Sequence, residues 1–415
     1  MKKDRFGNLI PRDLDYARGS ILKGSKEEEL RRIHGLTLVR DRNQKKIFNL
    51  TGVTRNSSLI KDDVRKMESW LSATHYSGKA EEMAVKFSGG DPKRHAATVM
   101  NRGTSAILAI ALCFVKKGEN VISITPDGIS YPSIARVVEV IGANLVEASP
   151  SDIKRLPKIV KRYKKVELLI ITPISTRKYH LPLELVKKTL DMGKKHGLLT
   201  FLDDAWASLR INVYHEPKTL ELGADLALLS PDKYMIGPRA GVVVGRKDLV
   251  AEINTRALMF GLESQQSQYV SVYRAFEDQD LSPIRRAGEL TDILFKKMKE
   301  TYDGRAYHLG GGVAMSEEDV LEIACKRTGR QPSITPGEAS SAHAMLMLGN
   351  YGIVTGLTMI APGRPPYSRL MLFPDGQKLG VDRIMEAIED SFDQLAKVID
   401  KPEEARKIIL GTKRW

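Results

Sequence analysis

Short apolar runs alternate with amphipathic stretches from residue 47 to about residue 275. We predict strands at Val121–Thr125, Asn144–Val146, Leu168–Thr172, Thr200–Leu202, Leu226–Leu229 and Val242–Val244. The helices predicted in this region are Ile60–Ser72, Gly103–Val115, Tyr131–Ile141, Ser151–Arg162 and Leu183–His196. Short apolar strands separated by amphipathic helices are typical of an α/β fold, in which helices cover both faces of a parallel sheet.

The pattern changes near both ends of the chain. A long helical stretch begins near Gln265 and leads into Ile284–Tyr302, and glycine-rich turns with short strands then precede a last predicted helix, Val381–Val398. The first 46 residues resemble an extended arm with one helix, Ser25–His34, opened by a capping box of Ser25 and Glu28. We therefore predict three parts: a basic N-terminal arm (1–46), a large ligand-binding domain (47–289) and a small α+β domain (290–415).

Composition indicates a globular protein and gives no sign of a membrane. Of the 415 residues, 42% are hydrophobic, and no apolar run reaches the eighteen residues that a membrane-spanning helix needs. The basic start leads into no apolar stretch, so a signal peptide is not expected. Cys113 and Cys325 are the only cysteines, and Cys113 sits in an apolar run typical of a core. These features predict a cytoplasmic location.

The chain is basic, with a formal net charge of +14. Residues 1–46 are locally richer in positive charge, with thirteen Lys and Arg against seven Asp and Glu. Such a charge is compatible with a nucleic-acid partner, an anionic substrate or a solvated surface. Acidic residues are interspersed nearly everywhere, and no aromatic residues interleave with the basic ones for base stacking, so a solvated surface is favoured.

An aspartate and a lysine that follow two predicted strands are the strongest indication of a catalytic site in this sequence. Asp203 ends the apolar run Leu198–Leu202, and Lys233 follows the next predicted strand in a stiff turn that contains Gly237 and Pro238. A pyridoxal phosphate enzyme needs a lysine that forms a Schiff base and a buried carboxylate that pairs with the pyridine nitrogen. A helix N-cap is the alternative explanation for Asp203, and a solvated charge is the alternative for Lys233.

Other residues could contribute to a binding site for the same cofactor, pyridoxal 5′-phosphate. Gly103, Thr104 and Ser105 open a predicted helix whose free amides can bind a phosphate, although such a start is also an ordinary cap. Ser230 can donate to the phosphate, and Ala205 is small enough for a ring to lie against the chain. Tyr131 follows the strand Val121–Thr125 and can stack on the ring, with plain packing as the alternative.

Arginines are the candidates for substrate binding. Arg369, in the stretch Pro365–Leu372, suits an amino-acid carboxylate, with a surface salt bridge as the alternative. Arg55 could line the site from the amino-terminal side, and Arg239 could face a phosphate or an acidic substrate. No metal site is predicted.

Together these residues resemble fold-type I pyridoxal phosphate enzymes, the aspartate aminotransferase superfamily. The likeness covers roughly residues 47–275 and is greatest to the L-seryl-tRNA(Sec) selenium transferase branch and its archaeal relatives. It is most specific in Asn49–Val53, Glu216-Pro217, Leu222–Leu226, Ser230–Lys233 and Gly237–Val242. The resemblance implies a mostly parallel seven-stranded sheet, with Lys233 as the Schiff-base lysine, Asp203 as the pyridine partner and Gly103–Ser105 as the phosphate cup.

The chain also departs from that branch. Arg239 stands where the branch has Gln, Asp204-Ala205-Trp206 replaces a glycine-serine-glycine, and the branch's helical tRNA-binding domain is shortened to about 46 residues. We therefore predict an enzyme that acts on a small amino acid or amino compound through an external aldimine, by lyase-type elimination or replacement. Transamination and selenium transfer to seryl-tRNA are the alternatives. The resemblance implies a homodimer or higher homo-oligomer, and a tRNA partner is not favoured.

Overall fold

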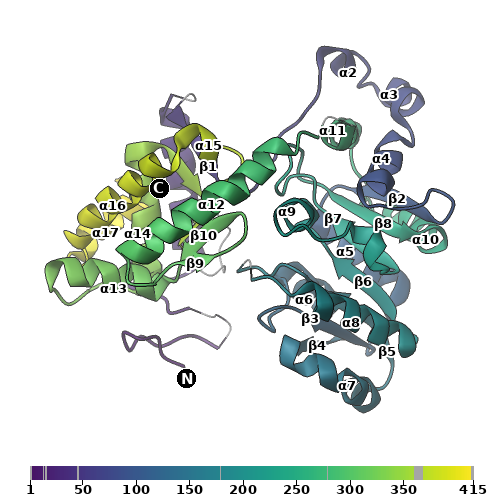
Figure 1. The fold of residues 1–415 in the computed structure, drawn as a ribbon, viewed down its shortest axis with the longest axis horizontal. Helices are drawn as coiled ribbons and strands as arrows, with labels where there is room; N and C mark the ends of the chain where they lie inside the picture. Colours follow the sequence, from purple (N-terminus) through teal and green to yellow (C-terminus); the bar gives the residue numbers. More distant parts are fainter. Residues whose placement is uncertain are drawn as a thin grey trace. The chain divides into compact units, whose positions relative to one another are not determined.

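A computed structural model describes residues 2–12, 14, 16–43, 46–177, 179–277, 279–358 and 368–412. The chain forms two compact units, one made of Met1–Val53 with Ser282–Trp415 and the other of Thr54–Leu281. We call them unit 1 and unit 2 (Figure 1). We predicted boundaries after residues 46 and 289, and the boundaries between the two units follow Val53 and Leu281. The predicted N-terminal arm belongs to unit 1, together with the C-terminal segment. No helix in the described ranges has the length and apolar character to cross a bilayer.

Unit 2 is built on a seven-stranded sheet whose spatial order is β2-β8-β7-β6-β5-β3-β4. The strands are β2 His95–Met100, β3 Asn120–Ile124, β4 Asn144–Ala148, β5 Val166–Ile171, β6 Leu199–Asp203, β7 Leu226–Leu229 and β8 Gly241–Arg246. Strand β8 runs in the opposite direction to the other six strands of this sheet. The six predicted strands are confirmed, and β2 was not predicted.

Helices cover both faces of this sheet, as the apolar pattern predicted. The helices of unit 2 are α2 Lys61–Arg65, α3 Ser69–Tyr76, α4 Lys79–Phe87, α5 Gly103–Phe114, α6 Pro132–Val140, α7 Leu156–Tyr163, α8 Leu183–Lys195, α9 Ala207–Val213, α10 Lys247–Met259 and α11 Gln266–Glu277, of which α2 and α3 do not pack on the sheet. One buried cluster joins α4, α8 and α11 to the sheet, and a second joins α5, α6 and α10. Two cores on opposite faces fit a sheet whose strands are apolar on both sides.

Two predicted helices of unit 2 are each divided into two elements. Instead of one helix over 60–72, α2 ends at Arg65 and α3 begins at Ser69. The carboxylate of Glu68 accepts hydrogen bonds from the amides of Trp70 and Leu71, at 3.3 and 3.2 Å, and so caps a new helix. Instead of one helix over 151–162, a 3₁₀ turn precedes α7, where Pro157 suits a first turn and disfavours a helix interior.

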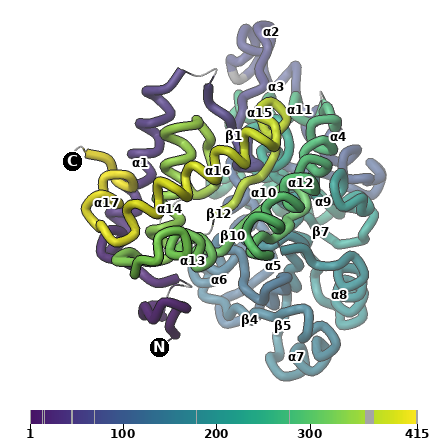
Figure 2. Tube along the Cα trace, turned by 60° about the vertical axis from the view of Figure 1, so that its left-hand side comes forward, coloured from purple at the N-terminus to yellow at the C-terminus, as the bar shows by residue number. Residues whose placement is uncertain are grey.

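Unit 1 combines helices with two small sheets. Its helices are α1 Ser25–Asp41, α12 Ser282–Thr301, α13 Glu317–Thr328, α14 Pro336–Leu346, α15 Gly376–Leu379, α16 Val381–Ala396 and α17 Pro402–Leu410. Strands β9 Tyr307–His308, β10 Gly312–Met315 and β12 Ser368–Met371 form an antiparallel sheet, and β1 Phe48–Leu50 pairs in parallel with β11 Ile353–Thr355. Figure 2 shows α16 beside α14. The predicted last helix is followed by α17.

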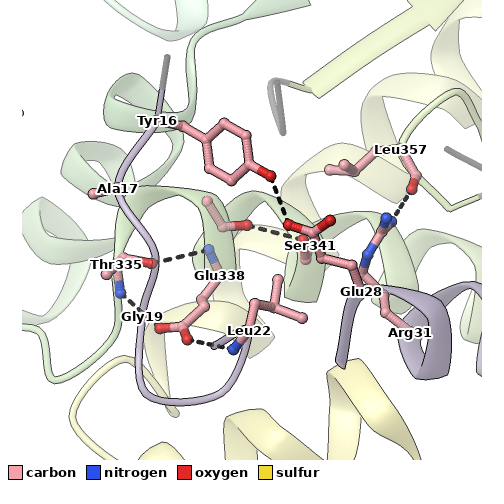
Figure 3. A pocket seen from close by; sticks show the side chains of 11 residues that line it. Tyr16, Ala17, Gly19, Leu22, Glu28, Arg31, Thr335, Glu338, Ser341 and Leu357 are labelled. Atoms are coloured by element: carbon pink, nitrogen blue, oxygen red, sulfur yellow. Dashed lines mark hydrogen bonds between the residues drawn. The ribbon is translucent and has the colours of Figure 1, made fainter. Parts of the chain in front are cut away.

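A buried carboxylate fastens the N-terminal segment within unit 1. Glu338, on α14, accepts hydrogen bonds from the amide of Ile21 at 2.6 Å and from the amide of Leu22 at 2.9 Å; Figure 3 shows the bond to Leu22. Its second oxygen accepts from the amide of Thr335 at 3.0 Å. Gly19 passes so close that a Cβ there would lie 2.1 Å from the Glu338 carboxylate. The segment therefore packs as a fixed part of unit 1.

The predicted capping box of α1 is wrong. The N-cap is Gly24, which has no side chain to accept the amides of the first turn. Glu28 is buried, and its carboxylate accepts the hydroxyl of Tyr16 at 2.6 Å (Figure 3). The guanidinium of Arg31 donates to the carbonyl of Leu357, and burial lowers the pKa of Arg31 to about 10. Glu28, which the sequence spacing predicted to cap the helix, therefore binds Tyr16 instead.

Candidate active site

The predicted acid and lysine lie at one edge of the unit 2 sheet. Strands β3, β5, β6 and β7 are parallel, so their carboxyl ends meet at the same edge. Asp203 is the last residue of β6, Thr172 follows β5, and Lys233 follows β7 by four residues. Tyr131 comes from the loop after β3 and precedes α6. Ligands of open α/β sheets bind at this edge.

The amine of Lys233 lies close to two aromatic rings. Its Nζ is 5.3 Å from the ring centre of Tyr131 and 5.6 Å from that of Trp206. Trp206 is buried, three residues beyond Asp203, and is packed against Tyr234 with ring centres 6.2 Å apart. The rings supply flat apolar surfaces around the amine.

The loop that carries Lys233 is held by short-range contacts. The Lys233 amide donates to the carbonyl of Ser230 at 3.0 Å. The Ser230 hydroxyl is within hydrogen-bonding distance of the Asp232 carboxylate, at 2.9 Å, and of the Ala240 carbonyl, at 3.2 Å. A Cβ on Gly237 would lie 2.5 Å from the carbonyl oxygen of residue 231, so the turn requires glycine there. The predicted donation from Ser230 to a phosphate therefore competes with acceptors inside the loop.

Asp203 is buried and forms no ion pair with any residue that the structure describes. Burial raises the pKa of its carboxyl group, and the nearby Lys233 acts in the opposite direction. Asp204 adds to the rise, whereas the backbone of Ala205 and the hydroxyl of Thr172 lower the pKa. A buried carboxylate without a cationic partner is costly, which makes this position suitable for a ligand that brings a proton.

Asp204 points into a separate buried network, in agreement with the structural role predicted for it. Its oxygens accept hydrogen bonds from Nε and Nη2 of Arg210, at 3.0 and 2.7 Å, and from the hydroxyl of Thr219 at 2.7 Å. Arg210 also lies 3.2 Å from Glu216, which lies 2.9 Å from His180. Arg210 and Asp204 are almost completely inaccessible to solvent. Their bidentate pair fixes the turn after Asp203.

The first turn of α5 begins at Gly103, as predicted, and the binding of a phosphate there stays a prediction. Gly103 opens the twelve-residue helix, whose N-cap, Arg102, gives its first amides no side-chain acceptor. The Ser105 hydroxyl donates to Asn101 at 2.6 Å. Two backbone segments approach each other closely beside this turn at Gly241, where a Cβ would lie 2.7 Å from the Arg102 carbonyl oxygen. At Gly103 the nearest atom to an added Cβ is 3.6 Å away.

The two predicted substrate arginines lie in different units. Arg55 belongs to unit 2 and is exposed, with a left-handed backbone (φ 51°). Arg369 belongs to unit 1, on β12 opposite Ala314. Residues 365–367, which precede it in the quoted stretch, lie outside the described residues. A role in substrate binding stays a prediction for both arginines.

Comparisons with known proteins agree on the cofactor. A family model described as Cys/Met metabolism PLP-dependent enzyme matches residues 83–274. A UPF0425 pyridoxal phosphate-dependent protein of Methanothermobacter thermautotrophicus is 28% identical, over 94% of this chain and 100% of the relative. An L-seryl-tRNA(Sec) selenium transferase of Rhizobium meliloti is 27% identical over 52% of each chain. A solved L-threonine transaldolase of Pseudomonas fluorescens has a TM-score of 0.62 at 15% identity, over 93% of this chain and 92% of that one.

The chain is a pyridoxal phosphate-dependent enzyme, and its fold is similar to that of fold-type I enzymes. The arrangement in unit 2 fits this cofactor. The buried carboxylate of Asp203 could hold the proton of the ring nitrogen, and the Lys233 amine could bond the aldehyde carbon. The open first turn of α5 could hold the phosphate.

Sequence reasoning missed three side chains at this edge of the enzyme. Trp206 stood in the quoted motif without a role, and its signal was an aromatic residue three positions after Asp203. Thr172 was placed inside a predicted strand, although it is the first residue after β5 and lowers the pKa of Asp203. Nothing in the sequence near Arg210 indicated its role, because its burial and its ion pair with Asp204 are evident only in the folded structure.

Proposed function

We propose that this enzyme acts on a small amino acid or another small amine, that Lys233 bonds the cofactor, and that the same amine then moves the α proton of the substrate. The observation that carries the proposal is the position of the Lys233 Nζ, within 6 Å of the ring centres of Tyr131 and Trp206 and on the same sheet edge as Asp203. Because the loop that carries Lys233 is held in place, the lysine amine can reach only a few positions, and this favours proton transfer at one carbon, the α carbon of the substrate.

Each side chain of this edge has a separate task in the proposal. When bound, the cofactor supplies a protonated ring that withdraws electrons from the bonds of the α carbon. Asp203 keeps that proton on the ring nitrogen and gains the partner that it otherwise lacks. Tyr131 and Trp206 support the ring faces, and the amides of Gly103–Ser105 bind the phosphate. Lys233, once released by the incoming amine, takes the α proton as general base.

Elimination or replacement at the β carbon is our preferred outcome. Two of the relatives are named selenium transferases that act on a seryl-tRNA, which is a replacement on a seryl group. Transamination is the second candidate, because Arg369 offers a guanidinium fork that matches an amino-acid carboxylate. A screen of amino acids against the purified holoenzyme separates these outcomes. Elimination releases ammonia and a keto acid without loading the cofactor with the amino group, whereas transamination leaves the cofactor in its amine form.

A tRNA-bound substrate is the third candidate. The names of the selenium transferase relatives and the net charge of +14 favour it. Filter binding of tRNA at increasing salt tests it, because phosphate contacts give a steep fall of affinity with salt concentration. Weak binding that hardly depends on salt would leave the small-molecule substrate as the better proposal.

Lys233→Ala tests the lysine assignment directly. The wild-type holoenzyme is expected to show a visible absorption band from the lysine-bonded cofactor, and the variant is expected to lose it. Lys187→Ala is the control, because Lys187 is an exposed lysine on α8 of the same unit. A band that persists in Lys233→Ala, or disappears in both variants, would contradict the assignment.

A further inference from the structure

Three arginines from three separate segments of unit 2 come together beside the lysine loop. Arg55 reaches this position because its neighbours bind the loop through the backbone. The amide of Thr54 donates to the Asp232 carbonyl at 2.9 Å, and the amide of Asn56 donates to the Gly237 carbonyl at 2.8 Å. Arg55 lies between these bonds with a φ of 51°, which is uncommon for a side chain of its size. Two backbone bonds therefore hold an arginine in an unfavourable conformation next to Lys233.

One amide joins the other two arginine segments. Nε2 of Gln268, on α11, donates both to the carbonyl of Asn101 at 2.8 Å and to that of Arg239 at 2.5 Å. The glycine at 241 lets the chain pass against the backbone of Arg102, since any Cβ there would lie 2.7 Å from the Arg102 carbonyl oxygen. Arg102, at the N-cap of α5, and Arg239, at the end of the lysine loop, are thereby fixed as neighbours.

Among the residues that the structure describes, none of the three guanidinium groups forms an ion pair with a carboxylate. Arg239 is exposed, but partial burial of its side chain lowers its pKa, and the positive charges of Arg55 and Arg102 lower it further, while the negative charge of Asp232 opposes the effect. Like charges held together by backbone geometry are unfavourable by themselves, so such a cluster indicates that an anion completes it.

The cofactor phosphate by itself does not account for all three arginines. The first turn of α5 follows Arg102 directly and offers backbone amides to the cofactor phosphate. The two neighbours of Arg55, Thr54 and Asn56, are bonded instead to the backbone on both sides of Lys233, which is where the substrate amine would react. Two guanidinium groups match the three oxygens and double charge of a phosphate better than the single charge of a carboxylate.

We propose that Arg55 and Arg239 form a second anion subsite, which binds a phosphate ester or phosphonate carried by the amino substrate. This proposal rests on the proposed function and narrows its substrate class: an amino acid or amine with a dianionic end group. The cofactor phosphate is the other source of the same chemistry, and the experiment below separates the two.

Three ligands of similar length carry different end groups: 2-amino-4-phosphonobutanoate has a doubly charged phosphonate, glutamate a singly charged carboxylate and 2-aminopentanoate an uncharged methyl group. Dissociation constants for the holoenzyme are measured by calorimetry and by the change of the visible band. We expect the phosphonate to bind about 10-fold more tightly than glutamate, the neutral ligand to bind least, and Arg55→Gln to remove most of the phosphonate's advantage. The affinity of Arg55→Gln for pyridoxal phosphate itself is expected to equal that of the wild type.

Arg94→Gln is the matched control, because Arg94 is an exposed arginine of unit 2 without an ion pair among the described residues. It should keep the wild-type order of ligands. Equal affinity for the three ligands, or a loss of cofactor affinity in Arg55→Gln without loss of phosphonate preference, would overturn the second subsite and assign the cluster to the cofactor phosphate. Absence of the visible band in the wild type would instead count against the proposed function.

Discussion

At the scale of single residues, two adjacent carboxylates have different surroundings because successive side chains of a strand point to opposite sides. Asp204 has a buried arginine and a threonine hydroxyl as partners, whereas Asp203 has no ion pair among the described residues and lies near Lys233. The sequence was enough to separate them, because Asp203 ends an apolar run. The ion pair between Arg210 and Asp204 could not be predicted, because a separation of six positions in the sequence does not show that the two side chains are buried together.

The unpaired Asp203 predicts a pH-dependent stability of the apoprotein. Burial raises the pKa of this carboxyl group above its value in the unfolded chain, despite the nearby Lys233. Its contribution to stability is therefore present below the unfolded pKa, about 4, and is lost as the pH rises through the folded pKa. Asp203→Asn cannot ionise, so its apoprotein should lose less stability than the wild type between about pH 4 and pH 8.

Thermal unfolding midpoints of the apoproteins across this pH range test the prediction. Asp191→Asn is the control, because Asp191 is exposed on α8 and should follow the wild type. If the midpoints of Asp203→Asn and the wild type fall in parallel as the pH rises, the carboxylate is not strained by burial and the argument fails.

At the scale of elements, apolar runs located six strands and most helices, and tertiary contacts decided the rest. Strand β2, with the sequence His-Ala-Ala-Thr-Val-Met, has few large apolar side chains, and its six-residue pairing with β8 makes it a strand. The division of residues 60–72 depends on the cap by Glu68, which a pattern of apolar positions does not include. The start of α5 was predicted correctly, but the glycine that the junction requires is Gly241 and not Gly103.

This difference between two glycines can be measured. Gly241→Ala would place a Cβ 2.7 Å from the Arg102 carbonyl, a backbone atom that cannot move aside, whereas Gly103→Ala leaves 3.6 Å. We expect Gly241→Ala to lower the free energy of unfolding by roughly 2 kcal/mol. Gly103→Ala should be close to neutral, because alanine is the better helix former. Urea unfolding of both variants provides the comparison, and a larger loss in Gly103→Ala would contradict the assignment.

At the scale of the whole molecule, the sequence indicated a large α/β part and a smaller α+β part, but not how the ends are combined. The first 53 residues belong to the same unit as the C-terminal segment, because β1 pairs with β11 and Glu338 binds the backbone at Ile21 and Leu22. Contacts between residues about 300 positions apart leave no local pattern. The net charge of +14 is also a property of the whole chain, and it does not identify a partner.

We propose that two copies of the chain form the working enzyme, as the resemblance to fold-type I enzymes implies. Analytical ultracentrifugation of the holoenzyme should show a species of twice the chain mass of 46.3 kDa, stable on dilution to the concentrations used in assays. A single species of 46.3 kDa across this range would count against it.

The central claim is a covalent bond between the cofactor and one lysine. Borohydride reduction of the holoenzyme makes such a bond permanent, and peptide mass mapping then locates it. The account predicts that the added cofactor mass is on the peptide that contains Lys233 and on no other. Modification of a different lysine, or no modification when cofactor is in excess, would contradict the account.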